Sequence, residues 1–143
     1  MNDIDYMKIA LKEAKKAYKK DEIPIGCIIV KNNKIISKAH NKREKTKKIS
    51  AHAEILAIEK ASKKLKNWHL NDCILYTTVE PCLMCSGAII QSRIKKIICS
   101  IKNEKYGELN NINNYLNQLD ITYGILEDES KKIMKDFFIK KRK

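Results

Sequence analysis

The sequence lacks the long hydrophobic run of roughly eighteen residues that a membrane-spanning helix requires. Its first residues, "MNDIDYMKIALKEAKKAY", carry acidic side chains where a secretory signal needs basic ones, and they contain no apolar stretch. The sequence also has no internal repeat and no linker, so its 143 residues predict one domain, residues 1–143, large enough to bury a core. These absences predict a cytoplasmic protein without a membrane partner.

The chain has few acidic residues relative to its basic ones. The chain has 17 acidic residues against 30 lysines and arginines, which gives a formal net charge of +13. The excess is spread over "KEAKKAYKK", "NKREKTKK", "KASKKLK" and the terminal "KKRK". A polyanionic partner such as a nucleic acid would fit this balance, and so would lysine runs that form solvated helix faces.

Five cysteines form an odd, irregular set with only one C-x-x-C pair, which excludes both a disulfide framework and a four-thiolate zinc site built from two such pairs. Cys27, Cys73 and Cys99 lie in apolar, strand-like runs and are expected to be buried. Cys82 and Cys85 lie one turn apart at a helix start, where free N–H groups favour thiolate. Taken alone, this pair is compatible with a redox centre, half of a structural zinc site, a catalytic zinc site or plain burial.

Hydrophobic periodicity predicts alternating helices and strands in the order αββαβαβαβα. Asn32 and Asn33 separate the first two strands and indicate a hairpin. Such an order favours a mixed sheet with helices on both faces. The expected helices are about 7–18, 52–65, 80–92, 112–119 and 127–143, the expected strands are 25–30, 35–40, 73–79, 94–100 and 121–126, and residues 41–50 are expected to be a loop.

The segment "SAHAEILAI" supplies a third metal ligand, His52, and a carboxylate, Glu54. One neutral imidazole and two thiolates would bring Zn²⁺ to a formal charge of zero and leave a position for water. Residues i and i+2 do not share a helix face, so His52 should lie at the helix edge while Glu54 reaches inward. By itself "HAE" is also an ordinary helix start, and only together with "PCLMC" does it indicate a catalytic metal site.

The combination of H-x-E with P-C-x-x-C resembles the signature of zinc nucleobase deaminases. Over nearly the whole chain, the blocks "EIPIGCIIV", "HNKR", "AHAEILAI", "LYTTVEPCLMCSGAIIQSRI" and "DFFIKKR" look like those of bacterial tRNA-specific adenosine deaminases. This resemblance implies an α/β protein with a three-layer α/β/α, cytidine-deaminase-like fold and a mixed five-stranded sheet. It also implies one Zn²⁺ per subunit held by His52, Cys82 and Cys85, with Glu54 as proton shuttle, in a homodimer.

The implied reaction is hydrolytic deamination of adenosine to inosine at the wobble position of a tRNA. Asn41 matches a base-contacting position, although an asparagine in a loop also often caps a turn. Ile25 and Ala51 match positions that line the base pocket. The resemblance further suggests that the C-terminal helix contacts the tRNA anticodon stem-loop, whereas at least one of its phenylalanines should pack in the core. The candidates for RNA contact are Phe138, Lys140, Lys141, Arg142 and Lys143.

Two other functions fit parts of the same pattern. One is deamination of a free base or nucleoside, guanine or cytosine, on the same fold, and the other is a non-catalytic, zinc-stabilised RNA-binding module. The chain departs from the family pattern at Cys27, where alanine is usual, and at "KKIS" before "AHAE". It keeps Lys105 and Gly107 of a Lys-x-Gly motif but lacks the Gly-Ser continuation.

Overall fold

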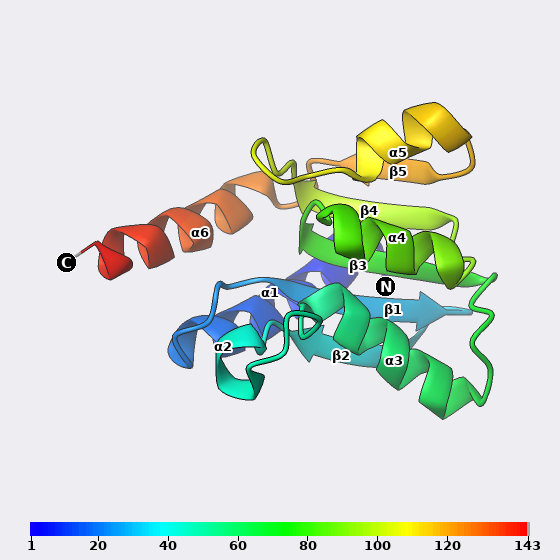
Figure 1. Ribbon diagram of the computed structural model, residues 1–143, viewed down its shortest axis with the longest axis horizontal. Helices are drawn as coiled ribbons and strands as arrows, with labels where there is room; N and C mark the ends of the chain where they lie inside the picture. Colours follow the sequence, from blue (N-terminus) through cyan, green and yellow to red (C-terminus); the bar gives the residue numbers. More distant parts are fainter. Residues whose placement is uncertain (143) are drawn as a thin grey trace.

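A single mixed β-sheet organises this computed structural model, which describes residues 1–142 with the exception of the Tyr115 side chain. The strand order is β2-β1-β3-β4-β5, as Figure 1 shows. Strand β1 is antiparallel to β2 and β3, whereas β3, β4 and β5 run parallel. The strands are β1 Gly26–Lys31, β2 Lys34–His40, β3 Cys73–Val79, β4 Lys96–Ile101 and β5 Asp120–Tyr123.

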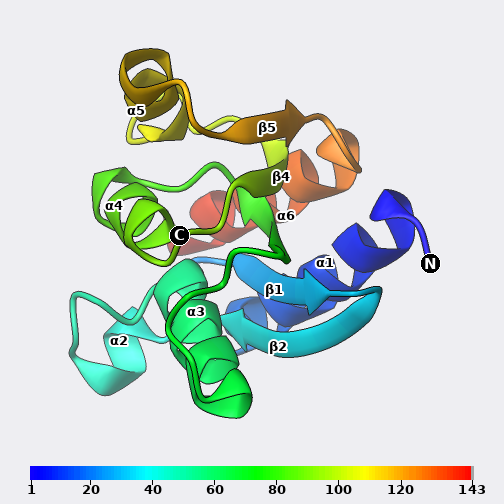
Figure 2. The same cartoon turned by 90° about the vertical axis from the view of Figure 1, so that its right-hand side faces the viewer.

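Helices cover both faces of this sheet, which confirms the expected three-layer α/β/α architecture. Figure 2 shows α3 and α4 on one side of the sheet and α1 on the other. The C-terminal helix α6 extends past the end of the sheet in Figure 1 and packs on α1 through Phe137 and Tyr18, whose ring centroids are 6.0 Å apart. The helices are α1 Asp3–Lys19, α2 Arg43–Thr46, α3 Ala53–Leu65, α4 Leu83–Gln91, α5 Leu109–Leu116 and α6 Glu127–Lys141.

Alternation along the strands divides the core into two parts. Ile28 and Tyr76 point toward α1, whereas Ile29 and Leu75 point toward α3 and α4. All four side chains are almost fully buried. The three strand cysteines, Cys27, Cys73 and Cys99, are buried as predicted. The helices that carry the metal-ligand candidates therefore rest on a dry, apolar sheet face.

The hairpin and the strand that leads into α4 match their predictions. Asn32 and Asn33 both adopt positive φ, at 50° and 60°, as a tight two-residue hairpin turn requires. Strand β3 has the predicted bounds, Cys73–Val79. Among residues 1–142, no helix combines the length and the apolar character that crossing a membrane requires.

Several helices differ from the predicted bounds for local reasons. Helix α1 begins at Asp3 instead of Met7, since Asn2 and Asp5 form a reciprocal capping box. The short helix α2 lies inside the expected loop 41–50. Helix α5 covers Leu109–Leu116 instead of 112–119, because Asn117 turns into the left-handed region with a φ of 51° and ends it.

Candidate active site

Three side chains with metal-ligand chemistry meet where α3 and α4 begin. His52 is the N-cap residue of α3, and Cys82 is the N-cap residue of α4, with Cys85 one turn further on. The Nδ1 atom of His52 lies 3.7 Å from Sγ of Cys82 and 3.5 Å from Sγ of Cys85. All three candidate ligand atoms lie within 4.8 Å of one another. The structure thus brings together the three ligands that the sequence predicted from two distant segments.

The electrostatics of this cluster suit a divalent cation. Hydrogen bonds with the Cys85 thiol and with His52 lower the pKa of Cys82 to about 3, so Cys82 carries a thiolate. The contact with Cys82, together with burial, raises the pKa of the Cys85 thiol, so Cys85 holds its proton more tightly than a free thiol does. A metal ion would replace that proton, because thiolates and a neutral imidazole are its ligands.

Glu54 lies next to the cluster, on the inner side of the first turn of α3. Its side chain is only 3% exposed, and it lines the same cavity as His52 and Cys82. Burial raises the pKa of Glu54 to about 7, which leaves the carboxyl able both to accept and to donate a proton near neutral pH. The expected geometry is confirmed, since His52 caps the helix while Glu54 reaches inward.

A cavity of about 680 Å³ opens above the cluster. Its volume suits a nucleobase with part of its sugar. Of the pocket residues that the resemblance implied, Ile25 and Asn41 line the cavity, whereas Ala51 is buried and is not among the lining residues. The full lining consists of Ile23, Ile25, Asn41, Arg43, Ile49, His52, Ala53, Glu54, Glu80, Cys82, Met84, Asn103, Lys105, Tyr106, Met134 and Phe138.

The Asn41 side chain caps a turn and also forms part of the cavity wall. Its Oδ1 atom accepts a hydrogen bond of 3.1 Å from the backbone N–H of Arg43, which is the turn-capping contact that an asparagine often makes. Its Nδ2 atom donates to the carbonyl oxygen of Ile23 over 3.3 Å. Asn41 also lines the cavity, and its amide group has a second N–H.

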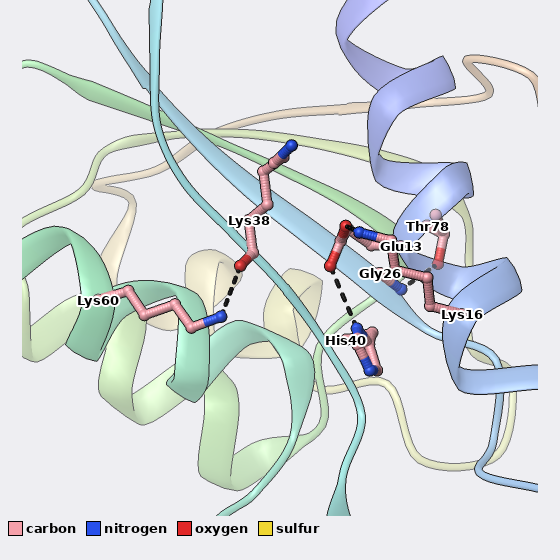
Figure 3. Close-up of polar contacts among 7 residues, drawn as sticks. All are labelled: Glu13, Lys16, Gly26, Lys38, His40, Lys60 and Thr78. Atoms are coloured by element: carbon pink, nitrogen blue, oxygen red, sulfur yellow. Dashed lines mark hydrogen bonds and ion pairs between the residues drawn. The ribbon is translucent and has the colours of Figure 1, made fainter. Parts of the chain in front are cut away.

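Polar contacts tie strands β1 and β2 to their neighbouring elements, as Figure 3 shows. Nδ1 of His40 lies 3.1 Å from a carboxylate oxygen of Glu13, and both side chains are buried. The backbone N–H of Gly26 donates to Oγ1 of Thr78, and Lys60 of α3 donates to the carbonyl oxygen of Lys38 in β2. His40 is thus bound to Glu13 and lies outside the metal cluster, as does His69, which packs against Trp68.

Sequence reasoning overlooked two buried carboxylates, those of Glu13 and Glu22. Glu13 falls on the apolar stripe of α1, three residues after Ala10 and four before Ala17. This spacing could have predicted that its carboxylate is buried. Glu22 is also buried, and its two oxygens accept from the backbone N–H groups of Glu44 and Lys45 at 2.9 and 2.8 Å. These bonds create the short helix α2 within the expected loop.

The two phenylalanines of α6 have different surroundings. Phe137 is buried, as expected of at least one of them, whereas Phe138 is exposed and lines the cavity. Nζ of Lys140 lies 5.0 Å from the ring centroid of Tyr18, and Lys141 pairs with Asp21 at 2.5 Å. Arg142 is exposed at the end of the helix, and the candidate Lys143 lies outside the described residues.

Comparison with known proteins places this geometry in a family. Residues 1–142 match the family model described as MafB19-like deaminase. The chain is 42% identical over 142 residues to a tRNA-specific adenosine deaminase of Aquifex aeolicus, and the match covers 96% of this chain and 94% of that protein.

Solved structures agree with these matches. A structure from studies of A-to-I editing by tRNA:A34 deaminases superposes with a TM-score of 0.85 at 32% identity, over 90% of this chain and 98% of that one. A guanine deaminase from Bacillus subtilis gives a TM-score of 0.68 at 39% identity, over 71% of this chain and 66% of that one. The chain belongs to the deaminase family that includes the bacterial tRNA-specific adenosine deaminases.

Proposed function

We propose that this protein hydrolyses adenosine to inosine at the wobble position of a tRNA, with one Zn²⁺ per subunit. The observation that carries the proposal is the buried carboxylate of Glu54 beside the His52, Cys82 and Cys85 cluster, at a cavity of about 680 Å³. The likeness to tRNA-specific adenosine deaminases over nearly the full chain supports the choice of substrate.

The site residues have distinct roles in this proposal. Zn²⁺ held by the three ligands would supply the Lewis acidity that makes a water acidic near neutral pH. Glu54 accepts a proton from the attacking water and delivers it to N1 of adenine as the oxygen adds to C6. The same carboxylate then takes the remaining proton of the hydroxyl added at C6 and passes it to the amine. The C6–N bond breaks, ammonia leaves and the oxygen stays on C6, so that one water is consumed and one ammonia is released.

The cavity mouth and the overall charge favour RNA over a free base. Exposed apolar side chains, Ile49, Tyr106 and Phe138, line the cavity and offer surfaces on which bases next to the reacting one can stack. The net charge of +13 suits a phosphate backbone. We further propose that the bound region is the anticodon stem-loop and that the protein acts as a homodimer, which sedimentation analysis can test.

Deamination of a free purine is the second candidate, because the guanine deaminase of Bacillus subtilis shares 39% identity with part of this chain. A non-catalytic RNA-binding module is the third. Such a module would have no use for a carboxylate buried beside the metal ligands, where Glu54 lies.

The deciding experiment incubates zinc-loaded protein with a tRNA transcript that carries adenine at the first anticodon position, and in parallel with guanine. We expect inosine at that base and no xanthine. The matched variant Glu54→Ala should bind zinc as the wild type does and lose activity by at least about 10²–10⁴-fold, the usual contribution of a positioned proton-transfer group. Xanthine without inosine would establish the second candidate, and no product from either substrate would favour the third.

A further inference from the structure

The segment 102–110, which follows β4 and includes the first two residues of α5, forms one wall of the cavity. Asn103, Lys105 and Tyr106 line the cavity from this segment. The Tyr106 side chain is 61% exposed, and Nζ of Lys105 lies 5.1 Å from its ring centroid, so an aromatic face and a cation stand together at the mouth. Most of this segment is neither helix nor strand, so contacts outside regular secondary structure must fix its position.

The buried carboxylate of Glu80 accepts two hydrogen bonds from the backbone of this segment and one from Tyr123 of β5. Its Oε1 atom accepts from the backbone N–H of Asn103 at 3.2 Å. Its Oε2 atom accepts from the backbone N–H of Asn110 at 3.2 Å and from the hydroxyl of Tyr123 at 3.0 Å. Glu80 is only 6% exposed, so these bonds to a charged acceptor are strong, and their donors would be costly to leave unpaired.

Gly107 permits this arrangement because the Glu80 carboxylate occupies the space that a side chain at position 107 would need. A Cβ atom on Gly107 would lie 2.5 Å from Oε1 of Glu80 and 2.5 Å from the carbonyl oxygen of Asn103. Gly107 also pairs with Cys82 as an isolated antiparallel bridge, and the N–H of Glu108 donates to the carbonyl oxygen of Pro81 at 3.1 Å. The glycine of the Lys-x-Gly motif thus lets the segment lie directly against the metal-ligand residues.

We propose that Glu80 is a positioning residue for substrate binding, one that holds the 102–110 segment so that Lys105 and Tyr106 face the incoming RNA. This inference rests on the proposed function, since it assigns to that wall the contact with the RNA chain. Both Glu80 oxygens are already engaged by protein donors, which leaves the chemical step to Glu54. Loss of the carboxylate therefore weakens substrate binding more than it slows turnover.

The substitution Glu80→Gln tests this role with almost no change in volume. A glutamine has one oxygen and one NH₂ group, so it cannot accept from all three donors, and at least one N–H faces another donor. Glu59→Gln is the matched control, since Glu59 is exposed on α3 and is not among the residues that line the cavity. For an anticodon stem-loop substrate, we expect Glu80→Gln to raise KM about tenfold with kcat within about threefold of the wild type, and Glu59→Gln to leave both unchanged.

Hydrogen exchange gives a second readout that needs no activity. The amides of Asn103 and Asn110 should exchange faster in Glu80→Gln, and in Tyr123→Phe the KM and the exchange rates should change in the same direction but by less. Zinc content should equal that of the wild type in both variants. Unchanged amide exchange, or a fall in kcat at constant KM, would overturn the positioning role. A wild-type protein that makes no inosine would instead refute the proposed function, while amide exchange would still report on the contact.

Discussion

At the scale of single residues, Asn41 makes a contact that serves the fold and has an N–H group that could serve the substrate. The substitution Asn41→Ser separates these roles, because a serine hydroxyl can still accept from the N–H of Arg43 but cannot donate as an amide does. We expect kcat/KM for the tRNA to fall about tenfold in Asn41→Ser and further in Asn41→Ala, since a hydrogen bond to the base is lost in both. Steady-state assays of inosine formation measure this.

Thermal melting of both variants provides the control for Asn41. Asn41→Ala should also lower the melting temperature, because the turn loses its acceptor, whereas Asn41→Ser should melt near the wild type. If Asn41→Ser keeps the wild-type kcat/KM, Asn41 does not bind the base and its role is the turn-capping contact with Arg43.

Residue-level prediction worked where the chemistry is local and missed what depends on distant partners. His52 and Glu54 lie in one short motif, and the C-x-x-C pair lies in another. Each motif alone was ambiguous, and the two together, through their resemblance to the deaminase signature, indicated a metal site. The carboxylates of Glu22 and Glu80 accept from backbone groups 22 to 30 residues away, at positions that a motif does not reveal. Their burial follows from the tertiary fold and not from their neighbours in the sequence.

At the scale of elements, the contact between α1 and β1 depends on a glycine. A Cβ atom on Gly26 would lie 2.0 Å from the carbonyl oxygen of Ala10 and 2.6 Å from the backbone nitrogen of Ala14. Because both obstacles are backbone, Gly26→Ala must push α1 away from the sheet. We expect it to lower the free energy of unfolding by about 1–3 kcal/mol or more, as measured by urea denaturation of the zinc-loaded protein.

Gly87→Ala is the matched control for that substitution. Gly87 lies inside α4, and a Cβ atom there would meet open space. Alanine is the better helix former, so the same change should raise the free energy of unfolding by about 0.5–1 kcal/mol. Equal effects of the two substitutions would contradict the close packing of α1 on β1.

The order of the elements was predictable from periodicity, whereas their ends were not. Strand β3 has its predicted bounds because an uninterrupted run of strand-forming residues lies between the polar "ND" and Pro81. Helix α5 was displaced by three residues because the side chain of Asn113 binds the backbone of Gln118 and Leu119 beyond its end. Capping contacts of this kind set the bounds within a predicted element.

At the scale of the whole molecule, the site follows from the direction of the strands. Strands β3 and β4 are parallel, so their carboxyl ends meet at one edge of the sheet. The first leads to Glu80 and Cys82, and the second leads to the 102–110 segment that Glu80 holds. The sequence predicted a mixed sheet, and the parallel pairing explains why segments some twenty residues apart form one cavity.

The distribution of charge over the molecule leads to a prediction about salt dependence. Lys140 and Arg142 lie at the end of α6, a few residues after Phe138, which lines the cavity. Lys131 and Lys132 lie near the start of that helix and pair with Glu127 and Asp136. If the helix end contacts RNA phosphates, each lost contact should flatten the slope of log K against log[salt] by about 0.7–0.9. The double variant Lys140→Gln with Arg142→Gln should therefore bind the stem-loop more weakly and with a flatter slope.

The equally charged control, Lys131→Gln with Lys132→Gln, should keep the wild-type slope in fluorescence anisotropy titrations. Identical slopes for the two double variants would show that net charge alone, and not the position of these cations beside the cavity, attracts the RNA.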